Sequence, residues 1–119
     1  MQRIMLRAKI HRPIVTDANI NYEGSIAIDE KLMEISGILE FEQVHIYNID
    51  NGNRFETYTI KAPAGSGTIS VNGAAARKVS IGDRIIIASY AVMEEQEAKS
   101  IQPKLVYIKE DNKTFDCKP

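Results

Sequence analysis

The sequence predicts a single all-β domain, a small closed barrel with short helices, and three observations favour this class. Short apolar runs recur along the whole chain, separated by Gly, Pro, Asn and Asp. Roughly six or seven such runs are strand candidates, and little of the chain is left for helices. The 119 residues suffice for one hydrophobic core and are too few for two. Strand count alone does not decide between a barrel and a sandwich, but it favours the barrel.

The first predicted strand spans residues 4–10, where apolar and polar side chains alternate. The apolar row, expected to face the core, consists of Ile4, Leu6, Ala8 and Ile10. This register places Lys9 and His11 together on the opposite face. Pro13 is expected to end or bend the strand, and residues 17–19 are expected to form a turn.

A short helix and a hairpin follow. Asp29 is a suitable N-cap for a helix that Gly37 ends. Strands are predicted at 43–49 and 54–62, joined by an Asn-Gly turn that accepts positive φ. In the second of these strands Arg54, Tyr58 and Ile60 share one face, whereas Thr57 points to the other unless a bulge rotates it.

The rest of the chain is predicted by the same reasoning. The expected elements are a strand at 68–71, a helical stub opened by the turn at 72–76, a turn at 80–83, a strand at 84–92, a last strand at 103–109 and a mobile tail at 110–119. The unbroken apolar run at 85–87 predicts a strand buried on both sides.

Composition excludes several functions. A net charge of −1 and the lack of Trp argue against a nucleic-acid partner. No stretch has the length of a membrane span, and the first residues lack an apolar signal region, so no membrane partner and a cytoplasmic location are expected. Cys117 is the only cysteine, which excludes an internal disulfide. His11 and His45 are far apart and no metal site is expected.

The dipeptide Gly24-Ser25 carries the most informative chemistry. A serine hydroxyl can attack the preceding carbonyl, cut the chain and leave a ketone, provided that the carbonyl is held close in a strained backbone. Gly-Ser is also a common turn dipeptide, and Gly65-Ser66 is a second copy in this chain. Elsewhere, Arg54 suits a carboxylate, although a solvated strand end is the simpler interpretation.

Two further features have both a functional and a plain structural interpretation. Tyr58 is either a proton donor or a core aromatic residue with its hydroxyl at the edge. The backbone of Asn72-Gly73-Ala74-Ala75 could present N–H groups to an anion, and a plain turn explains the same residues.

Several segments together resemble one family, the pyruvoyl-dependent aspartate 1-decarboxylases that make β-alanine for pantothenate. The matching segments are 5–12, Tyr22-Glu23-Gly24-Ser25 through Asp29, 51–58, Ile69-Ser70-Val71-Asn72-Gly73-Ala74-Ala75-Ala76 and 82–90. The resemblance covers residues 1 to about 109, with Tyr47 where family members often carry Trp. It implies a double-psi β-barrel and a homotetramer with active sites between subunits.

The resemblance also implies the chemistry. The proenzyme would cut itself between Gly24 and Ser25 into a β chain, 1–24, and an α chain, 25–119, with assistance from Thr57 and with Asn72 near the ester. Ser25 would become the pyruvoyl cofactor, which forms a Schiff base with L-aspartate and acts as an electron sink.

The implied site residues take distinct roles. Tyr58 would donate the proton, while Arg54 and Lys9 would hold a substrate carboxylate. The remaining residues expected to line the substrate site are His11, Tyr22, Thr57, Asn72, Gly73, Ala74 and Ala75. Two alternatives stay open: a non-catalytic small β-barrel binding module that is not cleaved, and a pyruvoyl decarboxylase for another amino acid. Whether a maturation partner assists the cleavage also stays open.

Overall fold

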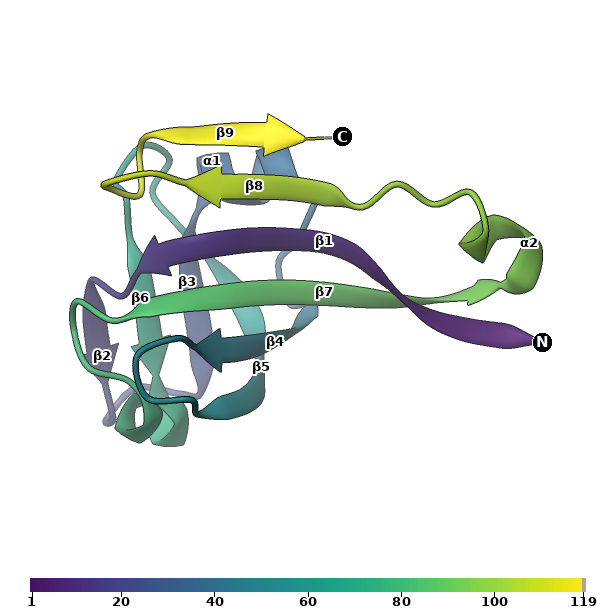
Figure 1. The fold of residues 1–119 in the computed structure, drawn as a ribbon. Coiled ribbons are helices and arrows are strands. Elements are labelled where there is room, and N and C mark those ends of the chain that lie inside the picture. The colour runs from purple at the N-terminus through teal and green to yellow at the C-terminus, as the bar shows by residue number, and fades with distance from the viewer. Residues whose placement is uncertain (119) are drawn as a thin grey trace.

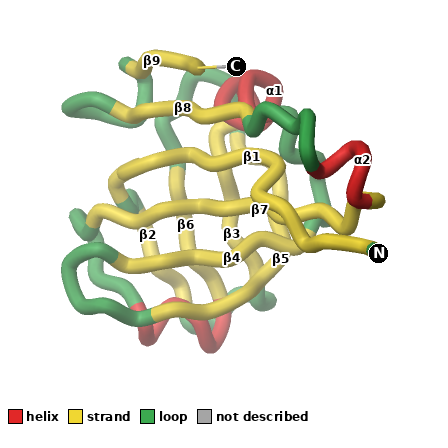
Figure 2. Tube along the Cα trace, turned by 45° about the vertical axis from the view of Figure 1, so that its right-hand side comes forward, coloured by secondary structure: helices red, strands yellow, loops and turns green. Residues whose placement is uncertain are grey.

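The computed structural model describes residues 1–118, which fold into one curved nine-stranded sheet with short helices at its margins (Figures 1 and 2). The strands are β1 (Gln2–Ile14), β2 (Asp17–Asn19), β3 (Ser25–Asp29), β4 (Gln43–Asn48), β5 (Arg54–Ala62), β6 (Ile69–Asn72), β7 (Arg84–Glu94), β8 (Lys104–Ile108) and β9 (Phe115–Lys118). The helices are α1 (Glu30–Ser36), the 3-10 helix η1 (Gly73–Lys78) and α2 (Glu95–Ala98).

The sheet closes because its two distant parts share one continuous stretch of chain. The strand order is β2-β6-β3-β5-β4-β7-β1-β8-β9. β2, at the beginning of this order, continues β1 after only Val15 and Thr16, whose amides donate to the carbonyls of Asp83 and Ile69 at 2.9 and 2.8 Å. Three strand pairs are parallel, β1–β8, β2–β6 and β3–β5, and the others are antiparallel. The structure thus confirms the predicted all-β barrel class.

Asn112 fastens the loop between β8 and β9 to the barrel. Its carboxamide accepts from the Ile14 amide at 2.7 Å and donates to the carbonyls of Ile14 and Gly67, both at 2.8 Å. The side chain is 5% exposed, so the three hydrogen bonds form away from water. One buried amide therefore joins the end of β1 to the loop that leads into β6.

The first strand differs from the prediction at its start. Ala8 and Ile10 are fully buried, but Ile4 is 75% exposed. A register shift between Leu6 and Ala8 interrupts the β1–β7 pairing, and the strands beyond it extend as an arm past the barrel (Figure 1). Ile4 pairs with Val92 and Lys9 with Ala88, so the shift places Ile4 and Leu6 on the face of Lys9. The expectation that Ile4 and Leu6 share the core face of Ala8 and Ile10 was therefore wrong.

Three further expectations differ from the structure. Residues 17–19 form β2 rather than a turn, because β6 offers them a parallel partner. Ile86 is only half-buried between the buried Ile85 and Ile87, so β7 is covered on one face rather than on both. The expected tail contains β9, which pairs with β8 from Leu105 to Ile108. Pro119, the last residue of the expected mobile tail, lies outside the described residues.

The local signals at α1 and at the hairpin are confirmed. The Asp29 carboxylate accepts from the Lys31 amide at 2.9 Å, and Gly37 ends the helix in the left-handed region. Gly52 in the Asn-Gly turn has a φ of 77°, as the turn requires. Pro13 accompanies a register shift near the end of β1, where Arg12 also takes positive φ.

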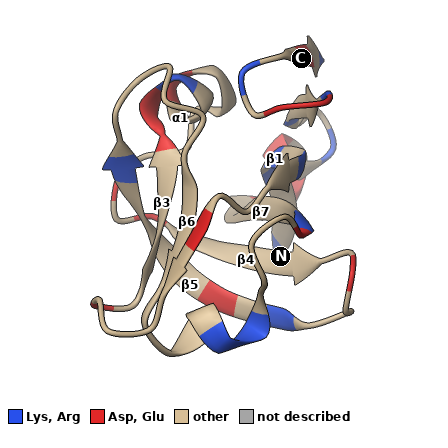
Figure 3. Cartoon of the chain, turned by 90° about the vertical axis from the view of Figure 1, so that its left-hand side faces the viewer, with Lys and Arg blue, Asp and Glu red and all other residues tan. Residues whose placement is uncertain are grey.

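The surface carries charges of both signs. Figure 3 shows Lys and Arg residues interspersed with Asp and Glu residues around the barrel. Within the described part of the chain, none of the helices is long and apolar enough to cross a membrane.

Candidate active site

Ser25 is the first residue of β3 and is almost completely buried, at 1% exposure. Its partner across the antiparallel pair is Asn72, the last residue of β6. The Asn72 amide nitrogen donates to Ser25 Oγ at 3.1 Å, and Ser25 Oγ lies 3.4 Å from the carbonyl oxygen of Glu23. The hydroxyl is therefore held beside its own preceding chain segment by a hydrogen-bond donor.

Gly73 packs directly against the exposed Gly24. A Cβ atom on Gly73 would lie 2.6 Å from Gly24 Cα, 2.8 Å from Gly24 N and 3.2 Å from the Tyr22 carbonyl oxygen. Gly73 also has a φ of 73°, which side-chain-bearing residues rarely adopt. Only glycine at this position lets the backbone at the start of η1 approach the Gly24 segment so closely.

The second Gly-Ser dipeptide has a different environment. Ser66 is exposed, and its hydroxyl bonds only to the neighbouring Thr68. The amides of Gly65 and Gly67 donate to the Asp29 carboxylate, each at 2.9 Å, so this loop wraps the N-cap of α1. Burial and partners, which the two dipeptide sequences do not reveal, separate Ser25 from Ser66.

Ser70 belongs to the same cluster and was missed at the level of sequence. Its hydroxyl donates to Asn72 Oδ1 at 3.0 Å, and its side chain is 9% exposed. Ser70 and Asn72 are two residues apart on β6, so they share a face. The sequence contained a signal for this: Ser70 stands two residues before Asn72 in the segment that carries the family resemblance, so both side chains could be placed on one face.

Ala74 and Ala75 continue from this cluster into η1. This helix has six residues, and the Asn72 side chain makes no cap hydrogen bond to it. Ala74 is exposed and Ala75 is half-buried. Tyr22, on the other side of Gly24, is 55% exposed. The Gly24–Ser25 bond is thus contacted by Asn72 and by Gly73 at the start of η1, with the Tyr22 carbonyl also close to Gly73.

Four predicted site residues lie on the outer face of the barrel: Lys9 and His11 on β1, and Arg54 and Tyr58 on β5. The registers align His11 with Ile86, Tyr47 and Arg54 across β1, β7, β4 and β5. The neighbouring row aligns Lys9 with Ala88, His45 and Glu56. Three strand spacings separate β1 from β5, so the backbones of His11 and Arg54 are roughly 14 Å apart in one chain, and Lys9 lies in the next row.

Arg54 is positioned by an aromatic pair. Its guanidinium carbon lies 4.0 Å from the centre of the Tyr47 ring. The hydroxyls of Tyr47 and Tyr90 are 2.7 Å apart, and this hydrogen bond together with burial raises the pKa of Tyr90. A guanidinium stacked on a ring keeps its edge N–H groups free, so Arg54 can donate hydrogen bonds to a carboxylate that arrives from solvent.

His11 is a half-buried imidazole with one unused polar atom. Its ring meets Tyr107 edge-on at 5.6 Å, and its buried Nδ1 has no hydrogen-bond partner among residues 1–118. Burial and the positive charges of Lys9 and Arg12 lower the pKa of His11 below its ordinary value. The neutral ring therefore predominates at neutral pH.

Thr57 and Tyr58 point to opposite faces of β5. Thr57 is paired with the buried Val44 and lies on the core side, whereas Tyr58 is paired with Gln43 and is 39% exposed. The parallel pairing of Ile26 with Thr59 places Ser25 beside Tyr58 at the next position of the register. Within residues 1–118, neither Thr57 nor Tyr58 is hydrogen-bonded to Ser25.

Within one chain, the predicted site residues thus lie in two separate groups. Gly24, Ser25, Asn72 and Gly73 form one contact cluster, with Tyr58 on the adjacent strand. Lys9 and His11 lie on β1, separated from β3 by β7, β4 and β5 along the outer face. The fold alone does not bring these two groups together.

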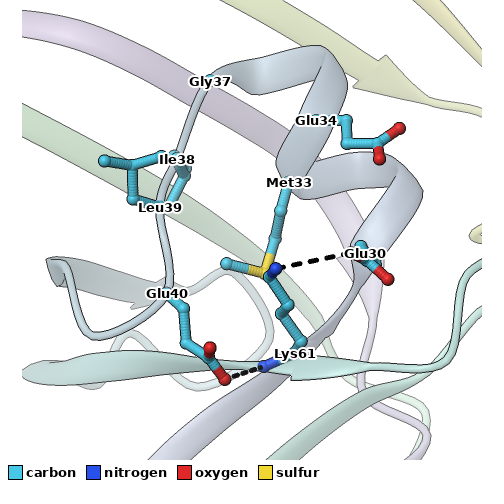
Figure 4. A pocket seen from close by; sticks show the side chains of 8 residues that line it. All are labelled: Glu30, Met33, Glu34, Gly37, Ile38, Leu39, Glu40 and Lys61. Atoms are coloured by element: carbon cyan, nitrogen blue, oxygen red, sulfur yellow. Dashed lines mark hydrogen bonds and ion pairs between the residues drawn. The ribbon is translucent and has the colours of Figure 1, made fainter.

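A pocket of about 420 Å³ lies elsewhere, between α1, the segment that follows it and β5. Figure 4 shows its lining, which contains none of the predicted site residues: Glu30, Met33, Glu34, Gly37, Ile38, Leu39, Glu40 and Lys61. Lys61 Nζ lies 3.4 Å from Glu30 Oε1 across it. No cluster of three or more His, Cys, Asp or Glu side chains suited to a metal ion occurs among the described residues.

The fold and the Ser25 cluster define a small β-barrel with a buried serine beside a backbone glycine. A model of the aspartate decarboxylase family matches residues 1–115. An aspartate 1-decarboxylase of Thermoanaerobacter pseudethanolicus is 58% identical over 95% of this chain and 97% of its own length. Those of Carboxydothermus hydrogenoformans and Bordetella avium are 59% and 53% identical, over 96% and 99% of this chain and 90% and 97% of their own lengths.

The chain therefore belongs to the aspartate decarboxylase family, which confirms the resemblance recognised in the sequence. Among solved structures, the rationally designed protein mkDPBB_sym_86 is similar with a TM-score of 0.47 and 17% identity, covering 71% of this chain and 91% of its own.

Proposed function

We propose that this chain cuts itself between Gly24 and Ser25 and that the product decarboxylates L-aspartate to β-alanine and carbon dioxide for pantothenate and coenzyme A synthesis. Aspartate decarboxylation is the activity of the family to which the chain belongs. The observation that carries the proposed cleavage is the burial of Ser25 at 1% exposure, with its hydroxyl bonded to Asn72. Ser66, in the same dipeptide, lacks both features.

In the proposed cleavage, Ser25 Oγ attacks the Gly24 carbonyl carbon and the Gly24–Ser25 C–N bond breaks. The proton of the hydroxyl passes to the freed nitrogen, so an ester replaces the amide. Loss of the Ser25 α-proton then expels the Gly24 carboxylate and leaves a dehydroalanyl residue, which water hydrolyses to the pyruvoyl group and ammonia. The products are chains 1–24 and 25–119.

The cluster fits both the cleavage and its product. The Asn72 amide donates to Ser25 Oγ, so it holds the attacking hydroxyl in place and can stabilise the negative charge that this oxygen gains when it leaves as part of the Gly24 carboxylate. A keto oxygen at the same position is also an acceptor and suits the same donor. Once formed, the pyruvoyl group would supply an electron sink for the loss of carbon dioxide.

The remaining site residues take roles that their positions allow. Arg54, stacked on Tyr47 with its edge free, would hold a carboxylate of L-aspartate, with Lys9 as a second cation. Tyr58, beside Ser25 in register, would donate the proton to the product carbanion. Thr57 would assist the cleavage and contact the substrate. The other residues that would line the substrate site are His11, Tyr22, Asn72, Gly73, Ala74 and Ala75.

We propose that the active protein is a homotetramer whose sites lie between subunits, in the cytoplasm. A second copy would bring its Lys9 and His11 to the Ser25 cluster, which one chain does not do. The arm also exposes an apolar pair, Ile4 and Val92, at 75% and 62% exposure, opposite each other on β1 and β7. A second copy would cover them.

Intact-mass spectrometry of the purified protein tests the cleavage. The expected result is conversion of the full chain into fragments 1–24 and 25–119, the latter without an N-terminal amine. Ser25→Ala should stay whole, whereas the control Ser66→Ala should be cut normally. Wild-type chain that stays whole after prolonged warm incubation would instead favour a non-catalytic β-barrel binding module.

Carbon dioxide release tests the activity separately. Cleaved protein should release carbon dioxide from L-aspartate, and Arg54→Met should reduce this activity by raising KM. L-glutamate in the same assay distinguishes the aspartate enzyme from a decarboxylase of a longer amino acid. Cleaved protein that prefers L-glutamate would retain the cofactor proposal and reject the substrate.

A further inference from the structure

Ser25, Asn72 and Ser70 form a continuous hydrogen-bonded chain on one face of β3 and β6. Ser70 Oγ donates to Asn72 Oδ1 at 3.0 Å, and Asn72 Nδ2 donates to Ser25 Oγ at 3.1 Å. Ser70, Asn72 and Ser25 are 9%, 5% and 1% exposed, so water competes little for these hydrogen bonds. A carboxamide held at both ends in this way has a fixed plane.

From this chain we infer that Ser70 is a positioning residue for the self-cleavage, acting through the Asn72 carboxamide; the inference rests on the proposed cleavage of Gly24–Ser25. The terminal torsion of an asparagine side chain is broad, so a carboxamide with one partner is free to turn. The bond from Ser70 removes that freedom. It therefore keeps the Asn72 N–H directed at Ser25 Oγ and holds the attacking hydroxyl in place.

The backbone shows why Ser70 can do this. Ser70 lies in the middle of β6, which pairs with β2 on one side and β3 on the other. Its own cross-strand partner on β3 is Ala27, two residues beyond Ser25. Both Ser70 and Asn72 are paired on both sides, but Asn72 is the last residue of β6 and is followed at once by η1, whereas Ser70 is continued by strand.

The experiment measures the rate of cleavage of freshly prepared full-length chain by intact mass. Ser70→Ala should cleave on the order of tenfold more slowly than wild type, the effect of losing one hydrogen bond that orients the amide holding the attacking hydroxyl. Ser36→Ala is the matched control, because Ser36 is also fully buried and its hydroxyl bonds only to the α1 segment. It should cleave at the wild-type rate.

A double-mutant cycle separates positioning from a merely structural role. If Ser70 acts through Asn72, the double variant Ser70→Ala/Asn72→Ala should cleave at the rate of Asn72→Ala alone, within about twofold. Effects that multiply would show that Ser70 acts independently and would overturn the inference. A wild-type rate for Ser70→Ala would overturn it as well.

The fallback variant is Ser70→Cys, which keeps the side-chain volume with a much weaker donor. It should be slowed like Ser70→Ala even if the alanine variant folds poorly, and a wild-type rate for it would count against the role of Ser70. Failure of the proposed function is recognised separately, because wild-type chain would then stay whole. When wild type is cut, the inference is rejected if these variants are cut equally fast or if the effects of Ser70→Ala and Asn72→Ala multiply.

Discussion

Replacing Gly73 by alanine perturbs the cleavage site at a single backbone contact. The added Cβ would lie 2.6 Å from Gly24 Cα, where carbon atoms normally stay about 3.5–4.0 Å apart. The overlap is therefore about 1 Å, and both atoms in contact belong to backbone rather than to a flexible side chain. Either Gly24 or Gly73 must move, and both lie at the bond expected to break.

Two effects of Gly73→Ala can be estimated separately. The positive φ costs alanine roughly 1–2 kcal/mol of folding free energy. A displacement of about 1 Å between Ser25 Oγ and the Gly24 carbonyl can slow a positioned reaction by about 100-fold. We therefore expect a folded, modestly destabilised chain that cleaves about 100-fold more slowly, measured by intact mass over time.

Gly52→Ala is the control for backbone strain alone. Gly52 has a φ of 77°, close to that of Gly73, but nothing lies within 4 Å of its added Cβ. It should lose similar stability and cleave normally. If Gly73→Ala cleaves at the wild-type rate, or if Gly52→Ala is slowed equally, the contact with Gly24 does not position the scissile bond.

Three further predictions concern the barrel and its charged groups. Asn112→Ala should lower the free energy of unfolding by about 3 kcal/mol, because it removes three buried hydrogen bonds; urea unfolding in an uncleavable variant measures this. Burial would raise the pKa of Glu42, but hydrogen bonds from a backbone amide, a serine and an arginine lower it overall. The ionised Glu42 therefore adds about 1 kcal/mol or less to the free energy of unfolding, after solvent screening. This stabilisation is complete above the pKa of Glu42 in the unfolded chain and is lost as the pH falls through its lower pKa in the folded chain. Glu42→Gln should flatten that acid dependence. Lys9→Gln should raise the titration midpoint of His11, followed by NMR, by removing a nearby positive charge.

Each of these has a contrary outcome. An Asn112→Ala chain as stable as its parent would show that the loop between β8 and β9 does not fasten the barrel. If the stability of Glu42→Gln falls with decreasing pH as that of its parent does, other carboxylates cause the loss of stability in acid. An unchanged His11 midpoint in Lys9→Gln would leave burial as the main cause of the lowered pKa.

Local signals in the sequence were sufficient for much of the fold. The Asp29 cap and the Gly37 terminator fix α1, and the Asn-Gly turn fixes the hairpin of β4 and β5, because each depends on a few adjacent residues. The alternation that put Lys9 and His11 opposite the core was also correct. It failed for Ile4, because alternation does not reveal the register shift between Leu6 and Ala8, which moves Ile4 to the outer face.

The candidate site was predicted through family resemblance more than through local pattern. Gly24-Ser25 and Gly65-Ser66 read alike in sequence, and their difference comes from the strands that surround them. The role of Ser70 likewise depends on a bond to a side chain two residues away along a strand that pairs with β3. β9 was missed because its ladder depends on β8 rather than on its own polar residues.

The sequence by itself determined the all-β class, the capped helix, the hairpin and the family, because these follow from neighbouring residues or from motifs at fixed spacing. Only the tertiary structure decided which of two Gly-Ser dipeptides is buried, that Gly73 touches Gly24, and that Lys9 and His11 lie apart from Ser25 in one chain. The physical reason is that burial and contact arise when strands distant in sequence pair around the barrel.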